Sequence, residues 1–282
     1  MQFWAPLQNP GATWYQHDPR YADRNSDPIS KPNQKHIEVI QWLGNTRGRV
    51  LDVGCGVGNF LHLARTVGWE CWGIDFDADA IKAGNQMFDL NTLAVMDLEM
   101  FVQMHPEARF ELITFFDVLE HLDNPAAFLE CVGALLTDNG AIAFSVPYRH
   151  GWRWLLPHDL PPRHLTRWDE VALREVLSKH GFIVERVHRL PASFYYLVMK
   201  LRFRYGAWFS VGAVQKARSS SHSRASDGAE TTASFLVRAV QVVAKMKDIL
   251  LFGIPAALLW TLLLPSRKRF TDVYGIARIT RK

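Results

Sequence analysis

The stretch VLDVGCGVGNF, residues 50–60, sets the first structural question, because three glycines directly follow a run of apolar residues. Glycine weakens the interior of a strand or helix, so Gly54, Gly56 and Gly58 need a structural reason. Their spacing differs from the G-x-G-x-x-G pattern that binds a pyrophosphate, and the stretch is not a G-x-x-x-x-G-K-[ST] loop either. We expect the bare backbone to pack against a nucleoside that carries no phosphates. A tight turn without a ligand is the alternative.

Length and composition bound the class of protein. The chain has 282 residues, 48% of them hydrophobic, which suits one large domain with an elaboration and argues against global disorder. The net charge of +4 is mild, and no Lys/Arg tract alternates with aromatic residues, so no nucleic-acid partner is expected. Cys55, Cys71 and Cys131 are odd in number and widely spaced, which disfavours disulfides and a zinc site. No secretory signal is visible, and we expect a cytoplasmic protein.

Apolar runs and helical spacings alternate along the first two thirds of the chain. We expect strands at 48–53, 70–75, 93–98, 110–116, 139–147 and 183–189, and helices at 36–43, 59–68, 77–87, 124–136 and 166–182. Strands that alternate with helices form a parallel sheet with helices on both faces, an α/β fold. Ligands of such sheets bind beyond the carboxyl ends of the strands, which is where the glycine loop lies.

Two acidic residues follow neighbouring strands and strengthen the nucleoside interpretation. Asp75 ends the second expected strand, 23 residues after Asp52, a separation that suits a carboxylate accepting hydrogen bonds from ribose hydroxyls. Asp97 ends the third expected strand, where it could meet an adenine amino group or simply serve as a turn residue.

Six segments then follow in an order that is typical of one family: LDVGCGVG, GIDFD, VMDLE, FFDVLEHLDNP, NGAIAFSVPY and RHLTRWDEVALREVLSKHGF. They resemble class I S-adenosylmethionine-dependent methyltransferases, especially the small-molecule and lipid-precursor O-methyltransferase branch, similar to ubiquinone-pathway methyltransferases. The resemblance covers about residues 36–190. It implies S-adenosylmethionine as cofactor and a Rossmann-like seven-stranded sheet whose last strand, at 271–279, is antiparallel.

The resemblance also implies roles for single residues. The loop glycines would approach the amino-acid part of the cofactor, Asp52 would support the loop, Asp75 would hold the ribose, and Asp97 with Leu98 would flank the adenine. The expected cofactor-binding residues are Asp52, Gly54, Cys55, Gly56, Gly58, Asp75, Phe76, Asp97, Leu98 and Asp117.

Candidate catalytic residues lie in FFDVLEHLDNP, after the fourth expected strand. Asp117, Glu120 and His121 can converge if the segment turns. His121 could be a general base, the trio could bind a divalent cation, or the residues could only shape the loop. Ubiquinone-pathway enzymes have a similar E-x-x-E-H arrangement, from which Asp117 departs at the first position. His164, in the loop before the last helix, is a second candidate. We take His121, Glu120 and His164 as catalytic candidates and assign no metal ligand.

The chain after residue 190 has a different character. We divide the sequence into a lead-in (1–35) that could cover the site, a cofactor-binding core (36–190), a helical and partly flexible insertion (191–270), and a last strand with its tail (271–282). The insertion contains an apolar run, Ile249 to Leu264, which is short for a bilayer-spanning helix that needs about 20 residues. Basic residues flank this run, so we expect it to lie on a membrane surface, with a buried cap or a dimer interface as the alternative.

The sequence therefore predicts an S-adenosylmethionine-dependent methyltransferase that O-methylates a small or lipid-linked acceptor, peripheral to the cytoplasmic face of a membrane. Two alternatives stay open. One is an NAD-dependent oxidoreductase on a similar sheet, and the other is a non-catalytic protein that keeps the cofactor fold.

Overall fold

The computed structural model describes residues 2–3, 8–11, 14, 33–150, 160–194, 196–198, 200–202 and 249–280. Most of the expected lead-in and the polar, low-complexity part of the expected insertion lie outside these residues. The chain divides into two compact units: Met1–Leu190 with Phe270–Lys282, and Pro191–Arg269.

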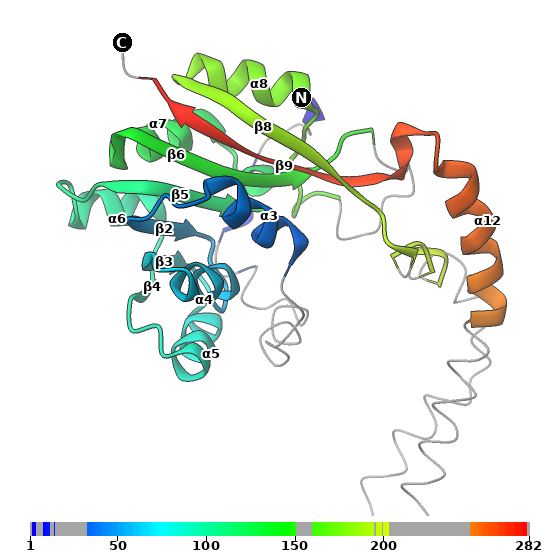
Figure 1. The fold of residues 1–282 in the computed structure, drawn as a ribbon, viewed down its shortest axis with the longest axis horizontal. Coiled ribbons are helices and arrows are strands. Elements are labelled where there is room, and N and C mark those ends of the chain that lie inside the picture. The colour runs from blue at the N-terminus through cyan, green and yellow to red at the C-terminus, as the bar shows by residue number, and fades with distance from the viewer. Residues whose placement is uncertain are drawn as a thin grey trace, which may run out of the picture. The chain divides into compact units, whose positions relative to one another are not determined.

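The first unit is built on a seven-stranded sheet with the order β4-β3-β2-β5-β6-β9-β8 (Figure 1). Its strands are β2 (Arg49–Val53), β3 (Glu70–Asp75), β4 (Leu93–Val95), β5 (Phe110–Phe116), β6 (Leu136–Pro147), β8 (Phe182–Pro191) and β9 (Phe270–Ile279). The first five pair in parallel, and β9 pairs antiparallel with β6. The expected fold class, including the antiparallel last strand, is confirmed.

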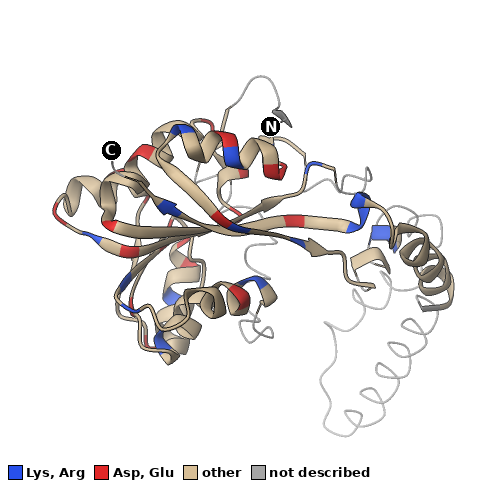
Figure 2. Cartoon of the chain, turned by 45° about the horizontal axis from the view of Figure 1, so that its top comes forward, with Lys and Arg blue, Asp and Glu red and all other residues tan. Residues whose placement is uncertain are grey.

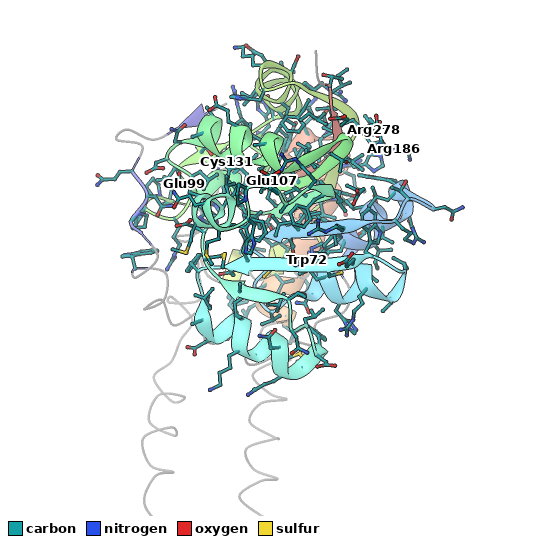
Figure 3. The ribbon with its side chains drawn as sticks, turned by 90° about the vertical axis from the view of Figure 1, so that its left-hand side faces the viewer. Trp72, Glu99, Glu107, Cys131, Arg186 and Arg278 are labelled. Atoms are coloured by element: carbon teal, nitrogen blue, oxygen red, sulfur yellow. The ribbon has the colours of Figure 1, made fainter. Side chains whose placement is uncertain are left out.

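Helices cover both faces of the sheet and bury a separate core on each (Figure 1). One face carries α3 (Gln34–Leu43), α4 (Asn59–Thr66) and α5 (Ala78–Phe88), and the other carries α6 (Leu98–Met104), α7 (Pro125–Leu135) and α8 (Glu170–Lys179). Figure 3 shows Glu99 of α6 and Cys131 of α7 on the same side of the sheet. Burial and the nearby charges of Glu99 and Glu130 raise the pKa of the Cys131 thiol, which disfavours its thiolate form.

Two expected elements differ from the structure. The third strand ends at Val95 rather than at residue 98, and Asp97 caps a helix that the sequence analysis missed, α6. The helix expected at 166–182 starts only at Glu170, because residues Thr166–Arg167 form a short strand, β7. β7 pairs with the N-terminal strand β1 (Gln2–Phe3).

The second unit is described mainly at its end. A π-helical turn, η3 (Ile249–Gly253), leads into α12 (Ile254–Leu263), and a 3₁₀ turn, η4 (Arg267–Arg269), follows. Figure 2 shows that α12 carries no charged residue, whereas η4 is basic. Among the described residues, every helix is too short or too polar to cross a lipid bilayer.

Candidate active site

The glycine loop between β2 and α4 adopts a backbone that side chains rarely allow. Gly54, Gly56 and Gly58 have φ angles of +74°, +54° and +82°, all in the left-handed region. A Cβ atom at Gly54 would lie 2.7 Å from the Val118 side chain, and one at Gly58 would lie 2.9 Å from Leu90. The loop is therefore packed tightly at the carboxyl edge of the sheet, directly against the segment that follows β5.

The carboxylate of Asp75, at the end of β3, fixes this loop. Its Oδ2 accepts a hydrogen bond from the Gly56 N–H (2.8 Å), and its Oδ1 accepts one from the Asp77 N–H (2.9 Å). A carboxylate has about four lone-pair positions, so these bonds are compatible with the expected contacts to ribose hydroxyls. Asp77 caps α5, and the half-buried Phe76 lies between the two acids.

The other expected cofactor residues lie at the carboxyl ends of β2 and β4 or directly after them. Asp52 is buried and accepts a hydrogen bond from the Thr114 hydroxyl (2.6 Å). Burial and the charge of Asp75 raise the pKa of Asp52 to about 7. Cys55 is buried within the loop. Beyond β4, Leu98 is buried, whereas the exposed Asp97 accepts a hydrogen bond from the Met100 N–H (2.7 Å) as a helix cap.

Asp117, directly after β5, is held by a buried lysine that the sequence analysis missed. The Nζ of Lys35 donates to both carboxylate oxygens of Asp117 (3.1 and 2.9 Å) and to the hydroxyl of Ser145 (3.0 Å). Ser145 in turn donates to Asp117 (2.7 Å). The backbone of Asp117 is left-handed, with φ +57°, which a short polar side chain tolerates better than most.

The electrostatics of this pair follow from its surroundings. Burial is the largest single influence on the pKa of Lys35 and lowers it, but the Asp117 and Asp272 carboxylates and the hydrogen bond to Asp117 together outweigh it, so the pKa is raised. Burial acts against ionisation of Asp117 as well, yet Lys35 and Ser145 lower its pKa to about 2. Since half of the Asp117 side chain remains exposed, it presents a fixed negative charge beside the glycine loop. A signal for Lys35 existed in the sequence, because Lys35, Val39 and Leu43 share one buried face of α3.

Glu120 and His121 form a 3₁₀ turn, η1 (Leu119–His121), and His164 approaches this turn from the loop before β7. The centroids of the His121 and His164 imidazole rings lie 4.9 Å apart, and the rings meet edge to face. Glu120 is fully buried, and burial followed by the charge of Asp117 raises its pKa well above the ordinary value. Burial thus disfavours the ionised form of Glu120. Its Oε2 has no hydrogen-bond partner among the described residues.

The tautomer of His121 follows from its hydrogen bond to the loop. Its Nδ1 lies 2.7 Å from the main-chain oxygen of Arg163. A carbonyl oxygen can only accept a hydrogen bond, so Nδ1 carries the proton and, in the neutral ring, Nε2 carries the lone pair. This Nε2 lies 3.9 Å from the Oε1 of Glu120. A basic nitrogen is thus oriented at the same edge of the sheet as the glycine loop.

The structure changes which residues could bind a cation. Glu120, His121 and His164 each offer one ligand atom, and these atoms lie within 4.8 Å of one another. Asp117 is instead paired with Lys35, so the trio of the sequence pattern is replaced by one that includes His164. One carboxyl group, which would lose its proton on metal binding, and two imidazoles suit zinc or a similar transition metal better than magnesium.

Comparisons with known proteins show the family of this chain. A family model described as a methyltransferase domain matches residues 19–187. A ubiquinone biosynthesis O-methyltransferase of Rhodopseudomonas palustris (strain TIE-1) is 28% identical over 163 residues, covering 52% of this chain and 60% of that protein. One from Actinobacillus pleuropneumoniae serotype 5b (strain L20) is 31% identical over 144 residues, covering 48% and 59%. The chain thus spans about 60% of the length of these relatives.

Solved structures share the fold at low sequence identity. A SAM-dependent methyltransferase from Archaeoglobus fulgidus has a TM-score of 0.56 and 17% identity, covering 93% of this chain and all of that one. Phosphoethanolamine N-methyltransferase 2 of Haemonchus contortus, in complex with S-adenosyl-L-methionine, has a TM-score of 0.53 and 16% identity, covering 88% and 52%. The family match favours the methyltransferase interpretation over the NAD-dependent oxidoreductase. The chain belongs to the methyltransferase-domain family, and its expected assignment to the class I S-adenosylmethionine-dependent methyltransferases is confirmed.

Proposed function

We propose that this chain transfers a methyl group from S-adenosylmethionine to a hydroxyl of a small or lipid-linked acceptor. The observation that carries the proposal is the meeting, at one edge of the sheet, of the glycine loop tied to Asp75 and the basic Nε2 of His121. The O-methyltransferase relatives support a hydroxyl acceptor.

The glycine side of the site would hold the cofactor. The left-handed loop brings bare backbone to the ligand, and Asp75 would accept hydrogen bonds from the ribose hydroxyls. Asp117, with its charge fixed by Lys35, would bind the ammonium of the cofactor's amino-acid part. Asp97 and Leu98 would line the adenine pocket beyond β4.

The histidine side would prepare the acceptor. S-adenosylmethionine supplies an electrophilic methyl group on a sulfonium. The Nε2 of His121 would take the proton of the acceptor hydroxyl as its oxygen bonds to the methyl carbon, and the carbon–sulfur electron pair would remain on sulfur. Burial disfavours ionisation of Glu120, which would limit the negative charge beside the developing alkoxide or phenoxide. Alignment supplies on the order of 7–11 kcal/mol at best, and the base contributes about 10²–10⁴-fold.

Substitution of His121 tests this role. His121→Ala is expected to slow transfer of labelled methyl groups from S-adenosylmethionine into cell lipid extract by about 10²–10⁴-fold. Titration calorimetry should show unchanged affinity for S-adenosylhomocysteine. His180→Ala is the matched control, because His180 follows α8 at the opposite edge of the sheet. Undiminished transfer by His121→Ala would remove the base role, and tight binding of NAD but not of S-adenosylhomocysteine would overturn the proposal as a whole.

The second unit would dock on the cytoplasmic face of an anionic membrane. Large apolar side chains of α12 are exposed, among them Leu258 (63%) and Leu262 (72%), one turn apart. The basic turn η4 follows and would meet anionic headgroups. Such a surface would give the enzyme access to a lipid-linked acceptor.

Liposome co-sedimentation tests the docking surface. Vesicles containing phosphatidylglycerol should sediment the full chain, and Leu258→Asp with Leu262→Asp should abolish this. Val171→Asp is the matched control, since Val171 is 74% exposed on α8 of the first unit. Equal sedimentation of all three proteins would exclude α12 as the contact, and absence of sedimentation in the unsubstituted chain would exclude membrane docking.

A further inference from the structure

The N-terminal segment reaches the turn that carries His121, although the two lie more than 100 residues apart in the sequence. The Nδ2 of Asn9 donates a hydrogen bond to the main-chain oxygen of His121 (2.7 Å). The Oδ1 of Asn9 accepts one from the Gly11 N–H (2.8 Å). Both ends of this amide are therefore engaged, and only a side chain that both donates and accepts can make the two bonds.

A second residue of the same segment, Trp14, contacts Arg163, which in turn is hydrogen-bonded to the ring of His121. The N–H of Trp14 donates to the Gly11 oxygen (3.1 Å), which continues the turn that starts at Asn9. The guanidinium of Arg163 lies over the Trp14 ring, 5.3 Å from its centroid. The main-chain oxygen of Arg163 is the acceptor for His121 Nδ1. Trp14 thus contacts the residue whose carbonyl sets the tautomer of His121.

Further contacts hold the loop between these two segments. β1 pairs with β7, with Phe3 opposite Thr166. On its other side the loop is joined to η1, because the Leu165 N–H donates to the Glu120 oxygen (2.7 Å) and the Thr166 hydroxyl donates to the Leu119 oxygen (3.3 Å). The loop that presents His164 and the Arg163 carbonyl is therefore held between the N-terminal strand and η1.

We infer that Asn9 and Trp14 are positioning residues that keep the His121 imidazole in its Nδ1–H tautomer, with Nε2 as the basic nitrogen. Asn9 fixes the main chain of His121, and Trp14 fixes Arg163, whose carbonyl accepts the Nδ1 proton. The inference rests on the proposed function for the use of that nitrogen, but the tautomer itself is a property of the chain that can be measured without an acceptor.

The experiment is long-range ¹H–¹⁵N NMR of the full chain with labelled histidine, with the His121 signal assigned by its loss in His121→Gln. The wild-type ring is expected as the Nδ1–H tautomer near pH 7.5. Asn9→Ala and Trp14→Leu should each move it to a mixture, with the Nδ1 and Nε2 shifts drawn toward each other. Asn9→Asp, which keeps the volume but sets an oxygen against the His121 carbonyl, should do the same.

The control Asn45→Asp lies in an exposed turn after α3 and should leave the His121 signals unchanged. An Nε2–H tautomer in the wild type, or an unchanged Nδ1–H tautomer in all the Asn9 and Trp14 variants, would overturn the inference. These results are separable from the proposed function, because loss of the base role would appear as undiminished methyl transfer by His121→Ala with the tautomer shifts intact.

Discussion

The glycine loop after β2 and the turn after β5 meet at one edge of the sheet, but they are built from different groups. Main-chain atoms form the first, with one carboxylate, Asp75, bonded to the loop backbone. The second depends on side chains from distant segments, in which Lys35 holds Asp117 and the Arg163 carbonyl orients His121. A backbone site tolerates few substitutions in the loop itself, whereas a side-chain site depends on residues far from it in the sequence.

The largest expected effect lies in the glycine loop, where main-chain atoms form the site. Gly54→Ala should weaken binding of S-adenosylhomocysteine about 100-fold, because it combines left-handed strain of roughly 1–2 kcal/mol with a Cβ 2.7 Å from Val118. Calorimetry measures it. Gly133→Ala is the control, since its Cβ would meet only Ile279 at 3.7 Å and helix propensity favours alanine. Equal affinities in the two variants would show that the loop does not touch the ligand.

A smaller loss of ligand affinity is expected from Asp75, the side chain that is hydrogen-bonded to the glycine loop. Asp75→Ala should reduce affinity for S-adenosylhomocysteine by about 1–3 kcal/mol, as expected for loss of hydrogen bonds to a charged group. Adenosine is a useful second ligand, because a ribose contact predicts a similar loss for both. A loss confined to S-adenosylhomocysteine would place Asp75 at the amino-acid part instead.

In the turn after β5, Lys35→Met removes the ion pair with Asp117 and should lower the free energy of unfolding at pH 7 by about 1–2 kcal/mol. The expected loss is this small because the Asp117 side chain is half exposed and solvent screens the pair. Lys179→Met breaks an exposed pair with Glu175 and should leave the free energy of unfolding almost unchanged. The pKa of Asp117 is lowered, so its contribution is present above about pH 4 and is lost as the pH falls toward 2. Urea unfolding between pH 7 and pH 2 measures the free energy of unfolding of wild type and Lys35→Met. The difference between the two proteins should shrink as the pH falls. A constant difference would contradict the pairing of Lys35 with Asp117.

A separate effect, on the pH dependence of stability, concerns Asp52 beneath the loop. Its pKa is raised to about 7, so the folded state binds a proton that the unfolded state releases, and stability falls as the pH rises from about 4 to 7. Asp52→Asn keeps an acceptor for the Thr114 hydroxyl and should remove this slope, which makes the variant the more stable protein at pH 8. Thermal unfolding at pH 5 and pH 8 measures the stability of wild type and Asp52→Asn. An equal change in stability between the two pH values for both proteins would show that Asp52 stays ionised.

The same contrast explains what the sequence could predict. Strand runs, loop glycines and the acid at the end of β3 are local patterns. They predicted the sheet, which is confirmed, whereas the place of the cofactor stays a prediction. Asp97 followed by an amphipathic run was also a local signal for α6. The predicted strand at 93–98 covered this signal, so the helix was not predicted. The contacts of Asn9 and Arg163 with His121 depend on the path of the N-terminal segment and of the loop before β7, which no spacing encodes.

A crystal structure of the full chain with S-adenosylhomocysteine tests the central claim most directly. The account predicts the adenosyl group at the carboxyl ends of β2 and β3, with backbone at 54–58 in contact with the ligand and the ribose hydroxyls within hydrogen-bond distance of Asp75. A ligand bound elsewhere, or a ribose turned away from Asp75 with the loop unengaged, would contradict it.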